Sequence, residues 1–289
     1  MQRRWLGALA IVLAIGCANR KPIIPPDRLW TEANGAFKDE AYEIALERYK
    51  MLLDQHPFDA NAEEAELKIA QSYFLSRRYA EAIAAFGDFE RQHPTSPSLP
   101  LVEYHLGLSY LAQASTPDRD PQPDTNALLY FRNIVDRFPN TPWAEKAQLR
   151  LRECREALAD HEAGITVFYL KRGNMRAAES RLRSLLLDYP ETEATAGTLD
   201  HFVRAYTARK ETVAATLALA TLARHHPDGP FGRDALKQLQ GEPAALTGPD
   251  PLPLLVAHLD QVGQQADRQQ VPHTVSAYPD APPGSAPAY

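Results

Sequence analysis

The stretch YKMLLDQHP, residues 49–57, ends an amphipathic helical pattern at a proline. Four later segments of the chain end in the same way. They are FGDFERQHP (86–94), FRNIVDRFP (131–139), LRSLLLDYP (182–190) and LALATLARHHP (217–227). Proline lacks a backbone N–H and its ring clashes with the preceding helical turn, so each of these prolines ends one helix. The chain therefore contains a recurring helix with a common ending.

A fixed order of small and large residues precedes each of these prolines. An alanine stands twelve residues before it, at Ala45, Ala82, Ala127, Ala178 and Ala215. Large apolar residues stand eight and five residues before it, as Tyr49 and Leu52 do before Pro57. Offsets of four and three residues lie on one face of a helix. On that face the small residue lets a neighbouring helix approach, and the large residues fill the space beside it.

A second helix precedes each of these helices. Its small and aromatic positions recur as Ala33 and Ala36, Ala70 and Tyr73, Gly107 and Tyr110, and later as Tyr169 and Tyr206. A two-helix unit of about 34 residues with such positions resembles the tetratricopeptide repeat. One pair cannot bury its apolar face alone, so repeats stack on one another. We therefore predict an all-α tetratricopeptide-repeat solenoid of about five helix pairs.

The spacing of the repeats divides the chain. From Thr141-Pro142, a good helix start, an apolar pattern continues to Leu170 with only a weak break at Gly164. It predicts a long or two-part linking helix between repeats 3 and 4. We predict an N-terminal half of three repeats over residues 28–140 and a C-terminal half of two repeats over 141–235. Residues 236–289 are rich in proline, and we predict a largely disordered tail with PLLVAHLDQVGQQADRQQ as its one plausible helix.

The N-terminus has the pattern of an export signal. Two arginines precede an apolar run, Trp5 to Ile15, which is far shorter than the ~20 residues that span a bilayer. The following AIGC resembles the bacterial lipobox, which predicts a lipoprotein signal peptide over 1–16, a lipid on Cys17 and an extended tether over 17–27. An ordinary signal peptide with an incidental Cys17 is the alternative. No aspartate follows Cys17, and by resemblance to bacterial lipoproteins this favours the outer membrane, on its periplasmic face.

Composition and motifs argue against several function classes. The formal charge of −6 does not suit a general nucleic-acid binder. Cys154 lies on an apolar helical stripe, where a buried thiol is the simplest interpretation. The sequence DHEAG at Asp160 lacks the second histidine of a helical zinc site, and His225-His226 precede a helix-ending proline. We predict no enzyme, no metal and no cofactor other than the covalent lipid on Cys17.

A binding surface remains as the functional prediction. In a tetratricopeptide stack the first helix of each pair lines a groove, and repeat phasing assigns positions to it. The predicted groove residues are Trp30, Asn34, Phe37, Lys38, Leu67, Gln71, Phe74, Leu75, Tyr104, Leu108 and Leu111. They suit an extended peptide that carries aromatic side chains, and each buried aromatic contributes roughly 1.5–3 kcal/mol. The alternative for each residue is a place in the core between paired helices.

Several segments together resemble one family. These are the lipobox, RDPQ (119–122), FPNTPWAEKAQLRL (138–151) and HEAGITVFYLKRG (161–173). They resemble the BamD family, also called ComL or YfiO-like, the lipoproteins of the outer-membrane β-barrel assembly machinery. The resemblance covers about residues 17–227. It implies a non-enzymatic subunit that aids the folding and insertion of β-barrels, works beside other assembly lipoproteins and captures signals of unfolded outer-membrane proteins with its N-terminal repeats.

The resemblance also implies that the C-terminal repeats hold periplasmic domains of the barrel-forming assembly subunit. We expect Arg204, Arg209 and Lys210 to pair with acidic loops there, although solvated helix charge is the alternative for each. Another outer-membrane tetratricopeptide lipoprotein, such as a secretin pilotin or a cell-division coordinator, is an alternative. A periplasmic peptidoglycan-acting enzyme is less favoured, because the residues after Pro227 are too few and too rich in proline for a catalytic domain.

Overall fold

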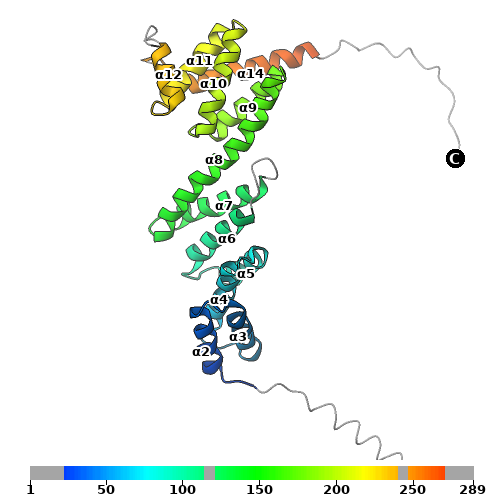
Figure 1. The fold of residues 1–289 in the computed structure, drawn as a ribbon, viewed down its shortest axis with the longest axis vertical. Coiled ribbons are helices and arrows are strands. Elements are labelled where there is room, and N and C mark those ends of the chain that lie inside the picture. The colour runs from blue at the N-terminus through cyan, green and yellow to red at the C-terminus, as the bar shows by residue number, and fades with distance from the viewer. Residues whose placement is uncertain (1–22, 114–120, 240–246, 271–289) are drawn as a thin grey trace, which may run out of the picture. The chain divides into compact units, whose positions relative to one another are not determined.

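The protein is described by a computed structural model that covers residues 23–113, 121–239 and 247–270 (Figure 1). Every regular element in these ranges is a helix, which confirms the predicted all-α class. The signal peptide, Cys17 and most of the predicted tether lie outside the described residues. The chain divides into two compact units, Met1–Cys154 (unit 1) and Arg155–Tyr289 (unit 2).

Unit 1 contains three pairs of helices. They are α2 (Pro26–Lys38) with α3 (Tyr42–Gln55), α4 (Ala62–Leu75) with α5 (Tyr79–Gln92), and α6 (Leu99–Gln113) with α7 (Gln122–Arg137). Each helix contacts the next along the chain, so the pairs stack in sequence order. We call α2, α4 and α6 the first helices, and α3, α5 and α7 the second helices. This arrangement confirms the repeat architecture predicted from the proline-ended segments.

The predicted core positions are buried in the first four repeats. The alanine and the two large residues before each proline are at most 1% exposed, as at Ala45, Tyr49 and Leu52. The fifth repeat differs, because Ala215 and Leu219 are only half-buried while Ala214 and Ala218 are buried. The second helix of this repeat, α11 (Thr212–His225), contacts α12 (Pro230–Gln238) and α14 (Pro251–Gln270) as well as its own partner. Residues on more than one side of this helix are therefore buried.

A buried charge lies between the helices of the third repeat. Glu103 on α6 is fully buried, and its Oε1 accepts a hydrogen bond of 2.6 Å from Nη1 of Arg137 on α7. The other carboxylate oxygen has no hydrogen-bond partner among the described residues. Burial raises the pKa of Glu103 to about 7, against the smaller effect of the Arg137 charge. The contribution of Glu103 to the stability of unit 1 therefore depends on pH.

The turns inside the helix pairs share one backbone feature. Glu40, Arg77 and Lys210 have φ values of 59°, 59° and 60°, and Gly173 has 73°. Each lies between the two helices of one pair. The left-handed conformation costs roughly 1–2 kcal/mol for a residue with a Cβ, whereas glycine adopts it freely. Three repeats therefore hold a side chain in a conformation that is strained locally and maintained by the packed helices.

The predicted linking helix is confirmed as α8 (Pro142–Lys171), which is 30 residues long. Its first part packs in unit 1, where Ala147 and Cys154 join the core around Phe131. Its last turns, with Tyr169 and Leu170, pack in unit 2. The two units therefore meet within this helix, after Cys154, and not at the predicted boundary of 140/141.

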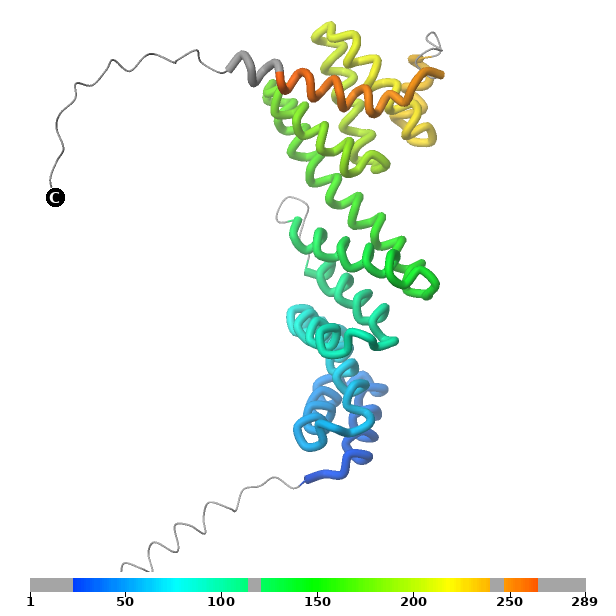
Figure 2. Tube along the Cα trace, turned by 180° about the vertical axis from the view of Figure 1, so that it is seen from behind, coloured from blue at the N-terminus to red at the C-terminus, as the bar shows by residue number. Residues whose placement is uncertain are grey.

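Unit 2 continues with α9 (Met175–Asp188), α10 (Glu193–Ala208), α11 (Thr212–His225), α12 (Pro230–Gln238) and α14 (Pro251–Gln270). Figure 2 shows α14, in orange, against the other helices of this unit, and it contacts α9 and α11. Leu255 and Leu259 of α14 are 0% and 4% exposed and belong to the core of unit 2. The helix predicted at residues 253–270 of the proline-rich tail is therefore confirmed, as α14.

Candidate functional site

The first helices of unit 1 present a repeated aromatic arrangement. The Phe37 ring on α2 lies edge-on to Tyr42 of α3, with 5.7 Å between ring centroids. The Nζ of Lys68, on the first helix of the next repeat, lies 4.5 Å from the centroid of the same ring. A cation over the face of a ring is attracted by its quadrupole. Phe37 is thereby held between its own pair and the next one.

The second repeat builds the same arrangement 37 residues later. The Phe74 ring on α4 lies edge-on to Tyr79 of α5, at 5.8 Å, and to His105 of α6, at 5.0 Å. Burial lowers the pKa of His105, so a neutral imidazole stands where the first repeat has an ammonium group. Repeat phasing alone did not identify Tyr42, Tyr79, Lys68 and His105 as part of this arrangement. The 37-residue spacing of Tyr42 to Tyr79 and of Lys68 to His105 is the signal that could have found them.

The outermost positions of these helices are open to solvent. Lys38 is exposed, and the Leu75 side chain is 45% exposed. Phe37, Gln71, Phe74, Leu108 and Leu111 are half-buried, so each keeps an accessible part. We call these seven residues the first-helix face of unit 1. A leucine of this exposure beside half-buried rings is a surface on which an apolar side chain can pack.

The structure corrects the groove prediction at the inner positions. Tyr104 and Leu67 are each only 9% exposed, and the Tyr104 ring packs against Phe131 and Trp143 at 5.7 and 5.2 Å. These residues belong to the core between stacked pairs, as the alternative interpretation held. The repeat phasing placed them on the correct helix. It could not distinguish the inner edge of the helix from its outer edge.

Asn34 and Trp30 also serve the interior of their own pair. Oδ1 of Asn34 accepts a hydrogen bond of 2.7 Å from the hydroxyl of Tyr49, which is fully buried. A buried hydroxyl needs such a partner. The half-buried Trp30 ring lies edge-on to the same tyrosine, with centroids 5.8 Å apart. Asn34 is thus committed to an internal contact, and Trp30 has only part of its ring available.

In unit 2, two of the three predicted cationic residues line one cleft. Arg209 and Lys210, at the turn between α10 and α11, border a cleft of about 640 Å³. Its other walls come from the start of α9, from the first turn of α11, where Val213 is 64% exposed, and from α14. Arg204 does not line this cleft, and its side chain pairs with Asp200 on α10 at 2.7 Å. We call this space the α9–α14 cleft.

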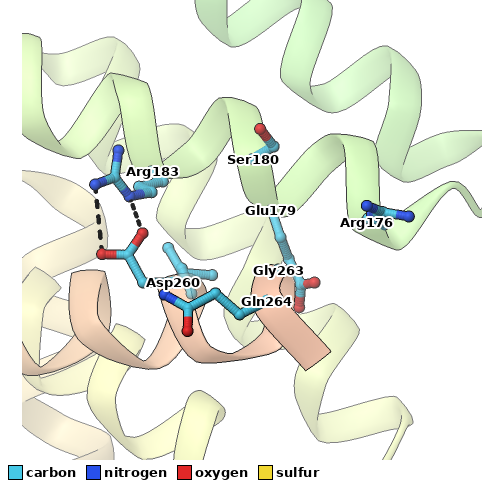
Figure 3. A pocket seen from close by; sticks show the side chains of 8 residues that line it. Arg176, Glu179, Ser180, Arg183, Asp260, Gly263 and Gln264 are labelled. Carbon is cyan, nitrogen blue, oxygen red and sulfur yellow. Dashed lines mark hydrogen bonds and ion pairs between the residues drawn. The ribbon is translucent and has the colours of Figure 1, made fainter. Parts of the chain in front are cut away.

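A smaller cavity of about 310 Å³ adjoins the α9–α14 cleft, and the two share Arg176 and Glu179. Figure 3 shows the guanidinium of Arg183 on α9 facing the carboxylate of Asp260 on α14, with two contacts between them. Glu179 is buried, and this raises its pKa while it accepts a hydrogen bond of 3.1 Å from Tyr206. The position of α14 is therefore fixed against α9 by charge as well as by apolar packing.

A third opening of about 500 Å³ lies between α8 and α10. Its lining includes the small residues Ala163, Gly164 and Gly197, beside the Phe168 ring, which is 51% exposed. The sequence analysis did not mark it. The spacing of small residues along both helices is the signal that could have found it, although small residues also serve close packing.

The described residues contain neither a candidate metal site nor a helix that could span a membrane. No group of three or more His, Cys, Asp or Glu side chains in the described ranges could hold a metal ion. Within the same ranges, no helix combines the length and apolar character that crossing a bilayer requires.

Comparison with known proteins decides the family. The family profile YfiO, described as "Outer membrane lipoprotein", matches residues 23–218. The chain belongs to this family. The YfiO match begins just before α2 and ends within α11, so it includes the first-helix face and unit 2 as far as residue 218.

Curated relatives agree with membership of the YfiO family. The chain is 32% identical over 213 residues to "Outer membrane protein assembly factor BamD" of Vibrio cholerae serotype O1, covering 69% of this chain and 88% of that protein. It is 27% identical over 238 residues to the Neisseria gonorrhoeae protein of the same name, covering 78% and 89%. A solved structure titled "TPR2AB-domain:pHSP90-complex of yeast Sti1" aligns at 15% identity with a TM-score of 0.41, over 84% of this chain and 95% of that one.

The YfiO match leaves the end of the described chain outside it. Helices α12 and α14 begin at Pro230 and Pro251, after the last matched residue, 218. One wall of the α9–α14 cleft, with His258 and Val262, therefore comes from a helix outside the matched range.

Proposed function

We propose that the protein is an outer-membrane protein assembly factor, a scaffold anchored by a lipid on Cys17 to the periplasmic face of the outer membrane. Membership of a family described as outer membrane lipoproteins supports this, as do the names of relatives that align over more than two thirds of the chain. The lipobox-like AIGC before residue 18 supports the anchor. The lipid is the one attached group that the proposal requires.

The first-helix face of unit 1 carries the proposal for substrate capture. It offers the exposed Leu75 beside the Phe74 ring and the exposed Lys38 beside the Phe37 ring, at equivalent places in two consecutive repeats. An extended peptide rises about 3.3 Å per residue and places alternate side chains on one side. Such a peptide, ending in an aromatic residue and a terminal carboxylate, can set its ring beside Leu75. The terminal carboxylate of this peptide is then attracted by the ammonium groups of Lys38 and Lys68 on the first helices.

Unit 2 supplies the contact with the barrel-forming assembly subunit in this proposal. Arg209 and Lys210 line the α9–α14 cleft, beside the exposed Val213. Arg209 is paired with Glu211 at 2.6 Å, whereas Lys210 has no side-chain partner among the described residues. An acidic loop with an apolar tip is complementary to this cleft. Arg204 lies outside it and is assigned no part in the contact.

The protein acts in this proposal by holding its partners, without a catalytic step. Peptide binding at the first-helix face is transient, so that the substrate can be released for insertion. A Leu75-sized side chain buried against a ligand contributes about 1.5–3 kcal/mol. A few such contacts give affinities in the micromolar range, which suits capture and release.

A binding experiment tests the substrate part of the proposal. Leu75→Arg places a charge on the first-helix face, and Leu129→Arg places the same charge on α7, a second helix, where the native leucine is 54% exposed. A fluorescent peptide with the C-terminal sequence of an outer-membrane barrel protein is titrated against each variant. We expect Leu75→Arg to weaken binding about tenfold or more, and Leu129→Arg to leave it unchanged. Equal affinities of the two variants contradict the proposed site.

A second experiment separates the proposal from its alternatives. Membranes are solubilised, and the protein is purified with whatever remains attached. The proposal expects the barrel-forming assembly subunit to co-purify, and Lys210→Glu to reduce its amount. Recovery of a secretin in its place supports a pilotin and contradicts the proposal.

A further inference from the structure

The two most exposed large apolar side chains of the described residues lie at the same end of unit 1. Phe58, in the loop between α3 and α4, is 99% exposed, and Ile23, just before α2, is 77% exposed. Single exposed apolar residues are common on protein surfaces. Two such exposed apolar side chains at one end of a helix stack indicate a surface that another apolar partner covers.

Hydrogen bonds bring the two residues to this common end. The backbone N–H of Ile24 donates to Oε1 of Gln55 at 2.8 Å, and the Ile24 carbonyl oxygen accepts from Nε2 of His56 at 2.7 Å. Gln55 is the last residue of α3, and Phe58 follows His56 by two residues. The segment that precedes α2 is therefore fixed against the end of the helix from which the Phe58 loop begins.

The loop itself presents Phe58 outward in a defined turn. The backbone N–H of Asp59 donates to the His56 carbonyl oxygen at 3.1 Å, which closes a turn around Pro57 and Phe58. The Asp59 carboxylate accepts from the backbone N–H and the side-chain Nδ2 of Asn61, at 2.9 and 3.0 Å. The Asp59 carboxylate is therefore bound to Asn61, the residue that precedes α4. The ring of Phe58 lies at the tip of an ordered turn. The neighbouring Asp59 carboxylate is bound to Asn61.

The position of Cys17 indicates what faces this end of the molecule. Cys17 precedes Ile23 by six residues, which span at most about 20 Å when fully extended. Acyl chains on Cys17 lie in the bilayer. Ile23, and the end of α3 to which this segment is bound, are therefore held within about 20 Å of the membrane surface. Because the anchor is this short, a second contact between the same end of unit 1 and the membrane is effectively intramolecular. The fraction of molecules that make this second contact is therefore strongly raised. This step depends on the lipid anchor of the proposed function.

We propose that Phe58 and Ile23 insert into the lipid surface beside the anchor, forming a second membrane contact that orients unit 1. Exposed carboxylates at the same end, Asp27 and Asp54, do not favour adsorption to anionic headgroups. The contact is therefore apolar, and it persists at high salt. With two points of attachment, unit 1 has a defined orientation relative to the membrane, whereas a single point of attachment leaves it free to rotate.

A site-specific fluorescent probe tests the proposal on the full acylated protein. Phe58→Cys is labelled with an NBD iodoacetamide, and the protein is reconstituted into phosphatidylethanolamine–phosphatidylglycerol vesicles. The native Cys154 is 1% exposed, and burial raises its pKa to about 12, so it does not react. The matched control is Thr95→Cys, since Thr95 follows Pro94 as Phe58 follows Pro57, one repeat further along the chain.

At position 58 we expect NBD emission to shift to the blue on vesicle binding, and lipids with a shallow doxyl group to quench it at least twofold. Neither change is expected at position 95, and 0.5 M NaCl is expected to leave the position-58 signal unchanged. Water-like emission at position 58 in protein whose mass shows the acyl chains overturns the membrane contact alone. A mature protein without acyl mass overturns the anchor and the contact together. Equal changes at both positions show general adsorption and also overturn the contact.

Discussion

Two glycines of unit 1 allow the packing of the repeats to be tested with one chemical change. Gly107 lies on α6, and a Cβ added there would lie 2.6 Å from Cζ and 2.7 Å from Cε1 of Phe131 on α7. Gly87 lies on α5, where an added Cβ meets no atom within 4 Å. Gly→Ala in a helix gains about 1 kcal/mol of helix propensity at either position. The difference between the two variants therefore isolates the contact with Phe131.

The expected magnitude follows from that contact. Phe131 is fully buried in the core of the third repeat, and its ring packs against Tyr104, so it has little room to move. Overpacking a well-packed core costs about 1–3 kcal/mol. Gly87→Ala is expected to raise the free energy of unfolding by about 1 kcal/mol. Gly107→Ala is expected to be less stable than Gly87→Ala by about 1–3 kcal/mol.

Urea unfolding at 25 °C, followed by tryptophan fluorescence, measures the difference. Trp30 and Trp143, the tryptophans in the described ranges, both lie in unit 1, so the signal reports on that unit. Phe131→Leu combined with Gly107→Ala removes the clash and is expected to recover part of the loss, as a double-mutant cycle. If Gly107→Ala is as stable as Gly87→Ala, the close approach of α6 and α7 does not depend on the small residue, and the reasoning is refuted.

Three further changes follow from particular residues of the structure. Burial raises the pKa of Glu103 to about 7, above its ordinary value of 4.5, so the native state binds this proton more tightly than the unfolded state does. The contribution of this proton to the free energy of unfolding is fully present below pH 4.5 and is lost as the pH rises through 7, by up to about 3 kcal/mol. Glu103→Gln is expected to remove this slope in urea titrations at pH 5 and pH 8. Arg77→Gly relieves a φ of 59° and is expected to stabilise unit 1 by about 1 kcal/mol in the same assay, whereas Ser76→Gly, at a φ of −77°, is expected to give no gain. Gly232→Ala would place a Cβ 1.8 Å from the His226 carbonyl oxygen and is expected to cost about 3 kcal/mol or more in thermal melts followed by circular dichroism, whereas Gly263→Ala, with no atom within 4 Å, is expected to be tolerated.

Much of the fold follows from local sequence rules. The alanine and large apolar positions before each proline predicted buried side chains in the first four repeats, because helical spacing fixes which residues share a face. The linking helix followed from an apolar pattern that Gly164 interrupts only weakly. The fifth repeat shows the limit of this reasoning, because the neighbours of α11 decide that Ala214 is buried in place of Ala215.

The remaining errors have a common physical cause. The sequence predicts a helix at residues 253–270 but not its packing, since Leu255 and Leu259 are buried by the contacts of α14 with α9 and α11. Tyr104 was placed in the groove by its phase, whereas its contact with Trp143 of α8 puts it in the core. Both outcomes depend on contacts between residues far apart in the chain. A pattern read along a single helix carries no information about them.

In the proposed function, the first-helix face of unit 1 receives unfolded outer-membrane proteins. Site-specific photocrosslinking in living cells tests it most directly, with a benzophenone amino acid in place of Leu75 and, as the control, in place of Leu129. The account predicts that a newly made barrel protein crosslinks at position 75 and not at position 129. Crosslinking at both positions alike, or at position 129 only, contradicts it.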